Sequence, residues 1–185
     1  MKQANGSVLD LIRDRALVKG VEVKLASGQS SNFYVDCKRI TLHGPSLKRV
    51  GEAFWARLKS ERPTLIAGVS VGGDPLVAAI LIAALQDGVE LSGLLVRKEK
   101  KSHGLAQGRA VDGPESTEKD SVWLVEDVIS TGGSSLKAAE HLVSEGYKLK
   151  GILSLVDREM GGIQSLGQKF GVPVISLHKI SEIGG

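Results

Sequence analysis

The sequence is poor in aromatic residues, in cysteine and in long runs of one charge. Only 4% of its 185 residues are aromatic, which argues against a protein that binds RNA by stacking bases on aromatic side chains. Cys37 is the only cysteine, so no internal disulfide can form, and we expect a reducing, cytoplasmic location. The longest basic run, RKEKK (97–101), is interrupted by Glu99. A net charge of +3 and a pI of about 9.0 suit an anionic small molecule as well as a nucleic acid.

Long apolar runs are also scarce. The N-terminal segment MKQANGSVLDLIRDR lacks the apolar core of a secretory signal. Residues 66–85 reach membrane-span length with Asp74 as their one charge, but three glycines and Pro75 interrupt their first half. This pattern predicts a buried strand, a glycine turn and a buried helix, and no membrane association is expected.

Apolar segments alternate with helical patterns along most of the chain. A helix is expected over 7–18, followed by short extended segments at 21–25 and 32–36. We expect Ser46 to cap a second helix, Asp74 a third, and Ser134 or Ser135 a fourth. Continuous apolar strands are predicted at 64–69, 91–96, 121–125, 151–156 and 173–177. This alternation predicts an α/β fold, a parallel twisted sheet flanked by helices, in one domain of 185 residues with a small N-terminal hood (about 1–40).

Ligands of such sheets bind at the carboxyl ends of the strands, so the segments that follow the strands are the candidate site. These segments are 70–73, 97–103, 126–134 and 157–162. The region 97–120 is charged, contains glycine and serine, and has no clear period. Loops of this length are commonly lids or binding loops, and its basic start predicts a mobile lid that closes over an anion.

The most informative stretch is VWLVEDVISTGGSS (122–135). Its buried strand leads into two carboxylates, Glu126 and Asp127, and then into a loop of glycine and hydroxyl residues before a helix. Backbone N–H groups at a helix N-terminus bind phosphate well, whereas carboxylates accept hydrogen bonds from sugar hydroxyls. The stretch therefore predicts a pocket for a ribose that bears a phosphate.

This stretch resembles the phosphoribosyl pyrophosphate (PRPP) signature of the type I phosphoribosyltransferases. Within that family the resemblance is closest to the orotate phosphoribosyltransferases. RKEKKSHG (97–104) is similar to their mobile catalytic loop, LASGQSSNFYVDCKRI (25–40) to the segment that covers orotate, and LVDREMGG (155–162) to a strand end whose arginine contacts orotate. The resemblance runs in order from about residue 20 to 165.

The resemblance implies the type I phosphoribosyltransferase fold, with a PRPP-binding core over about 41–185, and a homodimer whose catalytic loop is shared across subunits. It implies Mg²⁺-dependent transfer of phosphoribosyl from PRPP to orotate, forming orotidine 5′-monophosphate and pyrophosphate in pyrimidine synthesis. No direct protein ligand to the metal is expected, because Mg²⁺ is held through PRPP and water.

The site residues that follow from the resemblance fall into four groups. The catalytic residues are Lys101, His103 and Asp127. PRPP is bound by these three and by Arg97, Lys98, Glu126, Val128, Ile129, Ser130, Thr131, Gly132, Gly133 and Ser134. The turn of Ser70, Val71, Gly72 and Gly73 surrounds pyrophosphate, and orotate contacts Ser130, Arg158, Tyr34 and Ala26.

Three alternatives remain open at this point. A phosphoribosyltransferase for another base differs only through residues 25–40 and Arg158. A PRPP-sensing regulator that binds nucleic acid is compatible with the pI, although no recognition-helix motif is present. A serine esterase is suggested by GVSVG (68–72), with Asp157 and His178 following Ser70 in the order of a triad.

Overall fold

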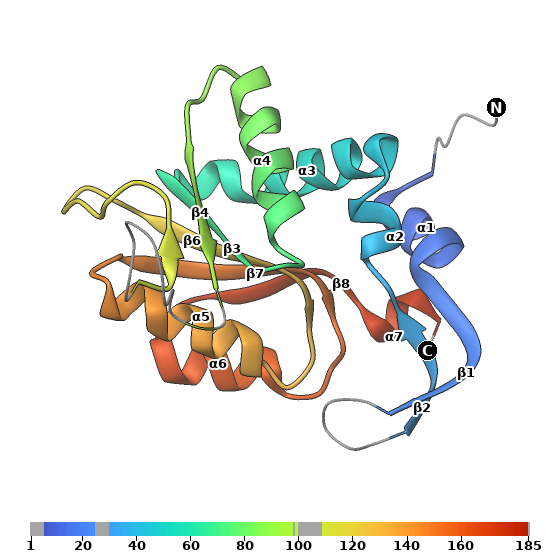
Figure 1. Cartoon of the computed structure of the whole chain (residues 1–185). Helices are drawn as coiled ribbons and strands as arrows, with labels where there is room; N and C mark the ends of the chain where they lie inside the picture. The colour runs from blue at the N-terminus through green and yellow to red at the C-terminus, as the bar shows by residue number, and fades with distance from the viewer. Residues whose placement is uncertain (1–5, 25–29, 98, 100–108, 185) are drawn as a thin grey trace.

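A computed structural model describes residues 6–24, 30–97, 99 and 109–184 (Figure 1). Its main sheet has six strands in the order β5-β4-β3-β6-β7-β8. The strands are β3 (Leu65–Val69), β4 (Ser92–Val96), β5 (Val111–Asp112), β6 (Val122–Ile129), β7 (Leu149–Asp157) and β8 (Val174–Lys179). All neighbours pair in parallel except β5, which lies antiparallel to β4 at the edge. The predicted parallel sheet is therefore confirmed.

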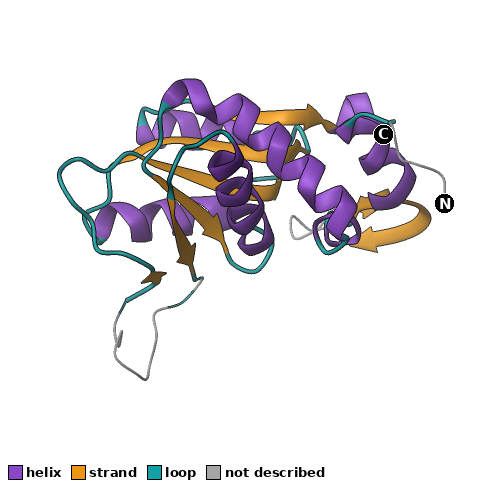
Figure 2. Ribbon diagram, turned by 90° about the horizontal axis from the view of Figure 1, so that it is seen from above, coloured by secondary structure: helices purple, strands orange, loops and turns teal. Residues whose placement is uncertain are grey.

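Helices cover both faces of this sheet (Figures 1 and 2). Helices α3 (Gly44–Leu58) and α4 (Asp74–Gln86) lie on one face, and α5 (Gly133–Ser144) and α6 (Gly162–Phe170) on the other. Side chains of a strand alternate between its two faces, so Ile66 joins the core cluster of α3 and α4 while Leu65 and Ala67 join that of α5. Burial on both faces explains why the central strand β3, buried at all five positions, is apolar throughout.

In the N-terminal region, the helix expected over 7–18 is shorter and ends at Ala16. Helix α1 (Val8–Leu11) continues as a π-helical turn, η1 (Ile12–Ala16), and the chain then becomes strand β1 (Leu17–Lys24). Strand β1 pairs antiparallel with β2 (Ser30–Val35), with Leu17 opposite Val35. This pairing overrides the helical pattern, so the helix ends at Ala16. Short elements complete the chain: α2 (Lys38–Thr41), the 3₁₀ turn η2 (Lys59–Glu61) and α7 (Ile180–Ile183).

The expected serine and aspartate caps are wrong, because backbone turns begin these helices. Helix α3 begins at Gly44, and the Ser46 hydroxyl instead lies 2.8 Å from His43 Nδ1. Gly73 precedes α4, so Asp74 is the first residue of that helix. Gly132 precedes α5 with φ of 84°, a left-handed conformation in which glycine carries no steric cost. The hydroxyls of these segments are thereby available for other contacts.

Candidate active site

The acidic pair lies inside strand β6, which continues to Ile129 and so extends four residues beyond the expected strand end at 125. Successive side chains of a strand point to opposite faces, so Glu126 and Asp127 serve different sides of the sheet. Glu126 is 5% exposed and accepts a hydrogen bond of 3.1 Å from the Ser135 hydroxyl of α5. The pair therefore forms two separate acidic positions, one on each side of the sheet.

Asp127 faces the side of α4 and lies against the turn that follows β3. A Cβ built on Gly72 would lie 2.6 Å from Cγ and from Oδ1 of Asp127, so this carboxylate is in contact with the Gly72 backbone. Asp127 Oδ1 also accepts a hydrogen bond of 2.8 Å from the N–H of Val128. The structure thus brings the predicted pyrophosphate turn and the second acidic residue together.

The turn itself is anchored at both ends. The N–H of Ser70 donates to the carbonyl of Val96 at 2.9 Å, and the N–H of Gly73 donates to that of Val69 at 2.7 Å. The Ser70 hydroxyl donates to Asp74 Oδ1 at 2.7 Å, and Val71 is 71% exposed. The turn therefore presents its backbone at the carboxyl end of β3, next to β6.

The loop between β6 and α5 surrounds a pocket of about 440 Å³. Its lining is made by Glu126, Val128, Ile129, Ser130, Thr131, Gly132, Gly133, Ser134, Ser135 and Lys137. Gly162 holds this loop in place, because its N–H donates to the carbonyl of Ser130 at 3.1 Å. A Cβ on Gly162 would lie 2.4 Å from that oxygen, so the close approach requires glycine. The predicted phosphate-binding residues are thus gathered at the N-terminus of α5, where N–H groups and the helix dipole favour an anion.

Arg158 follows β7 at the edge of the same site. Its N–H donates to the carbonyl of Ile129 at 2.8 Å, which joins the end of β7 to the end of β6. Asp157 is 6% exposed and accepts a hydrogen bond of 2.8 Å from the N–H of Glu159. The half-buried Arg158 side chain makes no hydrogen bond or ion pair within the described residues, which leaves its guanidinium for a ligand.

Of the remaining predicted site residues, the structure describes Tyr34 and Arg97 only. Tyr34 lies on β2 of the hood and is 39% exposed. Arg97 is exposed, and its Nε donates to Asp112 Oδ2 of β5 at 2.7 Å. Ala26, Lys98, Lys101 and His103 lie outside the described residues, so their roles stay predictions.

The second half of the expected lid is packed against the end of α5. The half-buried carboxylate of Glu145 accepts hydrogen bonds from the N–H groups of Ala110 and Val111 at 2.7 and 3.2 Å, and from Arg109 Nε at 3.0 Å. Because of the hydrogen bond to Glu145, the pKa of Arg109 is raised. Sequence reasoning missed this Glu145 cluster, since its members are 34 to 36 positions apart and match no motif. The segment 109–120 of the expected lid is thus anchored to the core, whereas 98 and 100–108 lie outside the described residues, so the lid over 97–120 stays a prediction.

The buried thiol of Cys37 lies next to the backbone of Asp127. Cys37 Sγ is 4.0 Å from the backbone carbonyl oxygen of Asp127, and burial raises the pKa of the thiol well above its usual value. The negative charges of Asp127 and Asp36 raise it further. Cys37 is therefore a neutral, buried packing group next to the backbone of Asp127.

The geometry does not support the esterase alternative. The Ser70 hydroxyl donates to Asp74, the Asp157 carboxylate accepts from its own turn, and His178 Nδ1 lies 3.7 Å from Glu182 Oε2. A catalytic serine must be within reach of its histidine. Within the described residues these three groups have other partners, so the GVSVG motif serves as a backbone turn.

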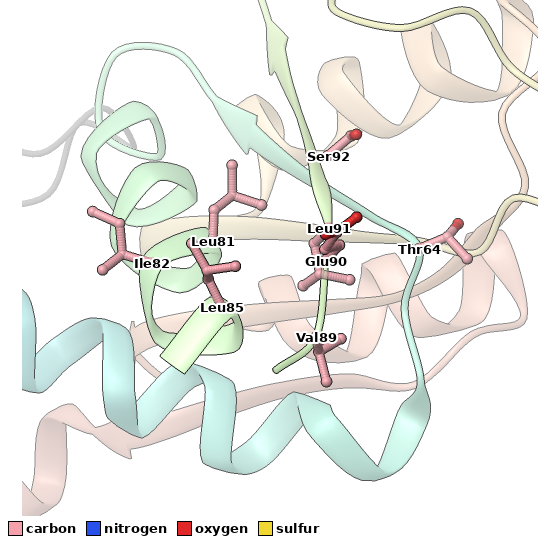
Figure 3. A pocket seen from close by; sticks show the side chains of 8 residues that line it. All are labelled: Thr64, Leu81, Ile82, Leu85, Val89, Glu90, Leu91 and Ser92. Atoms are coloured by element: carbon pink, nitrogen blue, oxygen red, sulfur yellow. The ribbon is translucent and has the colours of Figure 1, made fainter. Parts of the chain in front are cut away.

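A second hollow lies at the opposite end of the sheet, where β3 and β4 begin. It has a volume of about 530 Å³, and Figure 3 shows the side chains of Leu81, Leu85 and Val89 gathered around it. Ile82 and Leu85 of α4 are 60% and 63% exposed here. This apolar surface is separate from the polar pocket of the phosphate loop.

The described residues form neither a metal-binding cluster nor a membrane-spanning helix. No group of three or more His, Cys, Asp or Glu side chains there is arranged to hold a metal ion. No helix in the described parts of the chain has the length and apolar character needed to cross a membrane.

Comparison with known proteins places these features in a family. The phosphoribosyl transferase domain model matches residues 36–178. An orotate phosphoribosyltransferase of Rhodopirellula baltica is 38% identical over 183 residues, covering 96% of this chain and 92% of that protein. The crystal structure of Mycobacterium tuberculosis orotate phosphoribosyltransferase with Fe(III) dicitrate superposes with a TM-score of 0.82 at 29% identity, covering 96% and 97% of the two chains. The crystal structure of the same enzyme in complex with PRPP superposes with a TM-score of 0.77 at 26% identity, covering 96% and 97%.

Proposed function

The chain belongs to the orotate phosphoribosyltransferases, within the phosphoribosyl transferase domain family, and from this premise we propose how its residues act on PRPP and orotate. The reaction transfers the phosphoribosyl group of PRPP to a ring nitrogen of orotate. Its products are orotidine 5′-monophosphate, a precursor in pyrimidine nucleotide synthesis, and pyrophosphate.

One observation carries the assignment of the PRPP site. The loop 130–134 surrounds a pocket of about 440 Å³ at the N-terminus of α5, with the carboxylate of Glu126 in its wall and Asp127 next to it in the strand. Loop N–H groups and hydroxyls bind the 5′-phosphate of PRPP, because the helix dipole stabilises negative charge there. Glu126 and Asp127 accept hydrogen bonds from the ribose hydroxyls and hold C1 of the ribose toward the attacking base.

Pyrophosphate leaves from the other side of the ribose. The bond that breaks joins C1 to a pyrophosphate oxygen, so positive charge develops on the sugar and negative charge on the leaving group. The backbone of 70–73, in contact with Asp127, binds pyrophosphate as a turn of N–H groups. Arg97, Lys98 and Lys101 neutralise the growing charge, and His103 donates a hydrogen bond or proton to it.

Orotate binds at the end of β7. Its carboxylate needs a cation, and the Arg158 guanidinium can bind it through two parallel hydrogen bonds. Ser130 adds a contact from the phosphate loop, while Tyr34 and Ala26 cover the base from the hood. The absence of a described partner for the Arg158 side chain supports this role.

Magnesium is the expected cofactor, and the residues present fit it. Mg²⁺ keeps several waters and binds through one or two carboxylates together with substrate phosphates. Here PRPP oxygens and water would supply the shell of the ion with no direct protein ligand, while Glu126 in the pocket wall and Asp127 at the Gly72 turn would hold the ribose hydroxyls. The ion, when bound, shares in neutralising pyrophosphate.

We also propose that the active form is a homodimer in which each catalytic loop reaches the partner subunit's site. The outer side of α4 supports a second copy as the occupant, because this helix is apolar on all sides and exposes Ile82 and Leu85 (Figure 3). Helices with this pattern are normally buried. Light scattering is expected to give the dimer mass, and Ile82→Glu with Leu85→Glu to give the monomer mass. A monomer for the parent protein would leave the apolar surface to another partner.

The first test is an absorbance assay with orotate, PRPP and Mg²⁺, beside uracil, adenine, hypoxanthine and nicotinate as other acceptors. Loss of orotate absorbance that needs both PRPP and Mg²⁺ is the expected result. Turnover of another base, without turnover of orotate, would show that Arg158 does not bind an orotate carboxylate. Binding of PRPP without any turnover would favour a PRPP-sensing regulator, which salt-dependent RNA or DNA binding would then support.

A further inference from the structure

Glu126 is held by a serine that lies one residue beyond the loop expected to bind PRPP. The Ser135 hydroxyl donates to Glu126 Oε2 at 3.1 Å. Ser135 is 1% exposed and Glu126 is 5% exposed, so the contact is shielded from water. A hydrogen bond to a carboxylate is stronger than one between neutral groups, and more so where water is excluded.

We infer that Ser135 is a positioning residue of the reaction, because it fixes the direction of the Glu126 carboxylate in the wall of the PRPP pocket. A glutamate side chain has several rotatable bonds, and confining it costs conformational entropy. The hydrogen bond offsets that cost before the substrate arrives, so PRPP meets a carboxylate already in place. This inference rests on the proposed function.

The position of Ser135 in its helix supports this role. A serine near the start of a helix normally serves as a cap or bonds to the backbone of its own segment. Here Gly132 begins the helix by a backbone turn, and the N–H of Leu136 donates to its carbonyl at 2.8 Å. Ser135 is thus free of the capping task, and its hydroxyl crosses from α5 to the sheet.

A second buried serine provides a matched control. Ser154 of β7 lies directly opposite Glu126 in the strand register and is completely buried. Its hydroxyl has no hydrogen-bond partner in the described structure. Ser135 and Ser154 are therefore alike in residue type, burial and nearness to Glu126. They differ in that only the Ser135 hydroxyl donates a hydrogen bond to Glu126 among the described contacts.

The test compares the two serine-to-alanine variants in steady-state kinetics with orotate and PRPP. Ser135→Ala is expected to raise the KM for PRPP about tenfold, whereas Ser154→Ala keeps the parent value. Ser135→Thr, which keeps a hydroxyl, is expected to recover most of the loss. In a Glu126→Ala background, Ser135→Ala is expected to add no further effect, since it acts through that carboxylate.

Three results would overturn the inference. They are a parent-like KM for Ser135→Ala, equal effects of the two serine variants, or additive effects of Ser135→Ala and Glu126→Ala. Thermal unfolding of each variant separates a loss of folded protein from a loss of positioning. A parent protein that does not convert orotate would overturn the proposed function and this inference together, whereas an active parent with an unaffected Ser135→Ala overturns this inference alone.

Discussion

The carboxylate of Asp127 lies against the backbone of Gly72, so that a Cβ on Gly72 would be 2.6 Å from its Cγ. The two residues come from different βα connections, the turn after β3 and the end of β6. Because β3 and β6 are parallel neighbours, the residues at their carboxyl ends lie at the same edge of the sheet. The positions that we propose for the ribose, at Asp127, and for pyrophosphate, at the turn, are therefore adjacent, as the two parts of PRPP must be.

Gly72→Ala is expected to displace the Asp127 carboxylate and to lower kcat/KM for PRPP. The added methyl group would overlap the carboxylate, and a misplacement of about 1 Å can cost on the order of 100-fold in rate. Gly72 lies in a half-buried surface turn, so the fold should persist, as circular dichroism would verify. Gly44→Ala is the control, because a Cβ there meets no atom within 4 Å. Parent-like kinetics for Gly72→Ala would show that Asp127 is not held at this contact.

Arg158→Ala is expected to raise the KM for orotate while leaving that for PRPP nearly unchanged. A charged hydrogen bond lost from the orotate carboxylate corresponds to about 2 kcal/mol, or about 30-fold in KM. Arg57→Ala is a suitable control, since Arg57 at the end of α3 forms an exposed ion pair of 3.3 Å with Glu61 of η2. A rise in the KM for PRPP instead would assign Arg158 to the other substrate.

The parallel sheet and the candidate site at its edge could be predicted from the sequence, because the central strands are buried and apolar and the glycine loops follow them. Strand β6 shows where the pattern failed. Glu126 and Asp127 look like a strand end because they are charged, yet pairing with β7 continues through them to Ile129. Charged residues inside a strand are tolerated here because Glu126 is bonded to Ser135 and Asp127 lies at the Gly72 turn.

Contacts between distant side chains could not be predicted. The helix expected over 7–18 ended early because Leu17 pairs with Val35, which no local pattern indicates. Ser135 fits the sequence pattern of a helix cap, and only the packing of α5 on the sheet shows its bond to Glu126. The hydrogen bonds of Glu145 likewise form only because the end of α5 packs against residues 109–111, at the start of β5.

Glu145→Gln is expected to destabilise the fold by about 2 kcal/mol, since it weakens several hydrogen bonds to one charged group. Glu145 bonds to the N–H groups of Ala110 and Val111 and to Arg109, and its side chain is 15% exposed. Urea unfolding measures the loss. Glu140→Gln on α5, the helix that ends just before Glu145, is the control, because its ion pair with Lys169 is exposed and surface pairs contribute little. Equal urea midpoints for Glu145→Gln and Glu140→Gln would contradict the inference that Glu145 anchors residues 109–111.

Lys101→Ala is expected to lower kcat by about 100-fold, as the loss of one charge-stabilising group does in other enzymes. Lys101 lies outside the described residues, so this expectation comes from the RKEKKSHG pattern. Single-turnover measurements with saturating PRPP report the chemical step directly. Lys48→Ala on α3, which removes an exposed ion pair with Glu52, is the control. An unchanged rate for Lys101→Ala would make the lid hypothesis wrong.

The stability of the protein is expected to fall as the pH drops below about 6.5, and His178 is a cause of this dependence. Burial lowers the pKa of His178 in the folded state, and the positive charge of Arg13 lowers it further, while Glu182 at 3.7 Å opposes the shift. The unfolded chain therefore binds a proton at a higher pH than the folded chain does. Below the ordinary histidine pKa of 6.5 the unfolded state gains that proton first, so stability is lost until the pH reaches the lower, folded pKa. His178→Gln removes this proton uptake, and its urea midpoint should change less than that of the parent protein between pH 7.5 and 5.5. An equal change in both proteins would show that His178 titrates alike in the folded and unfolded chains.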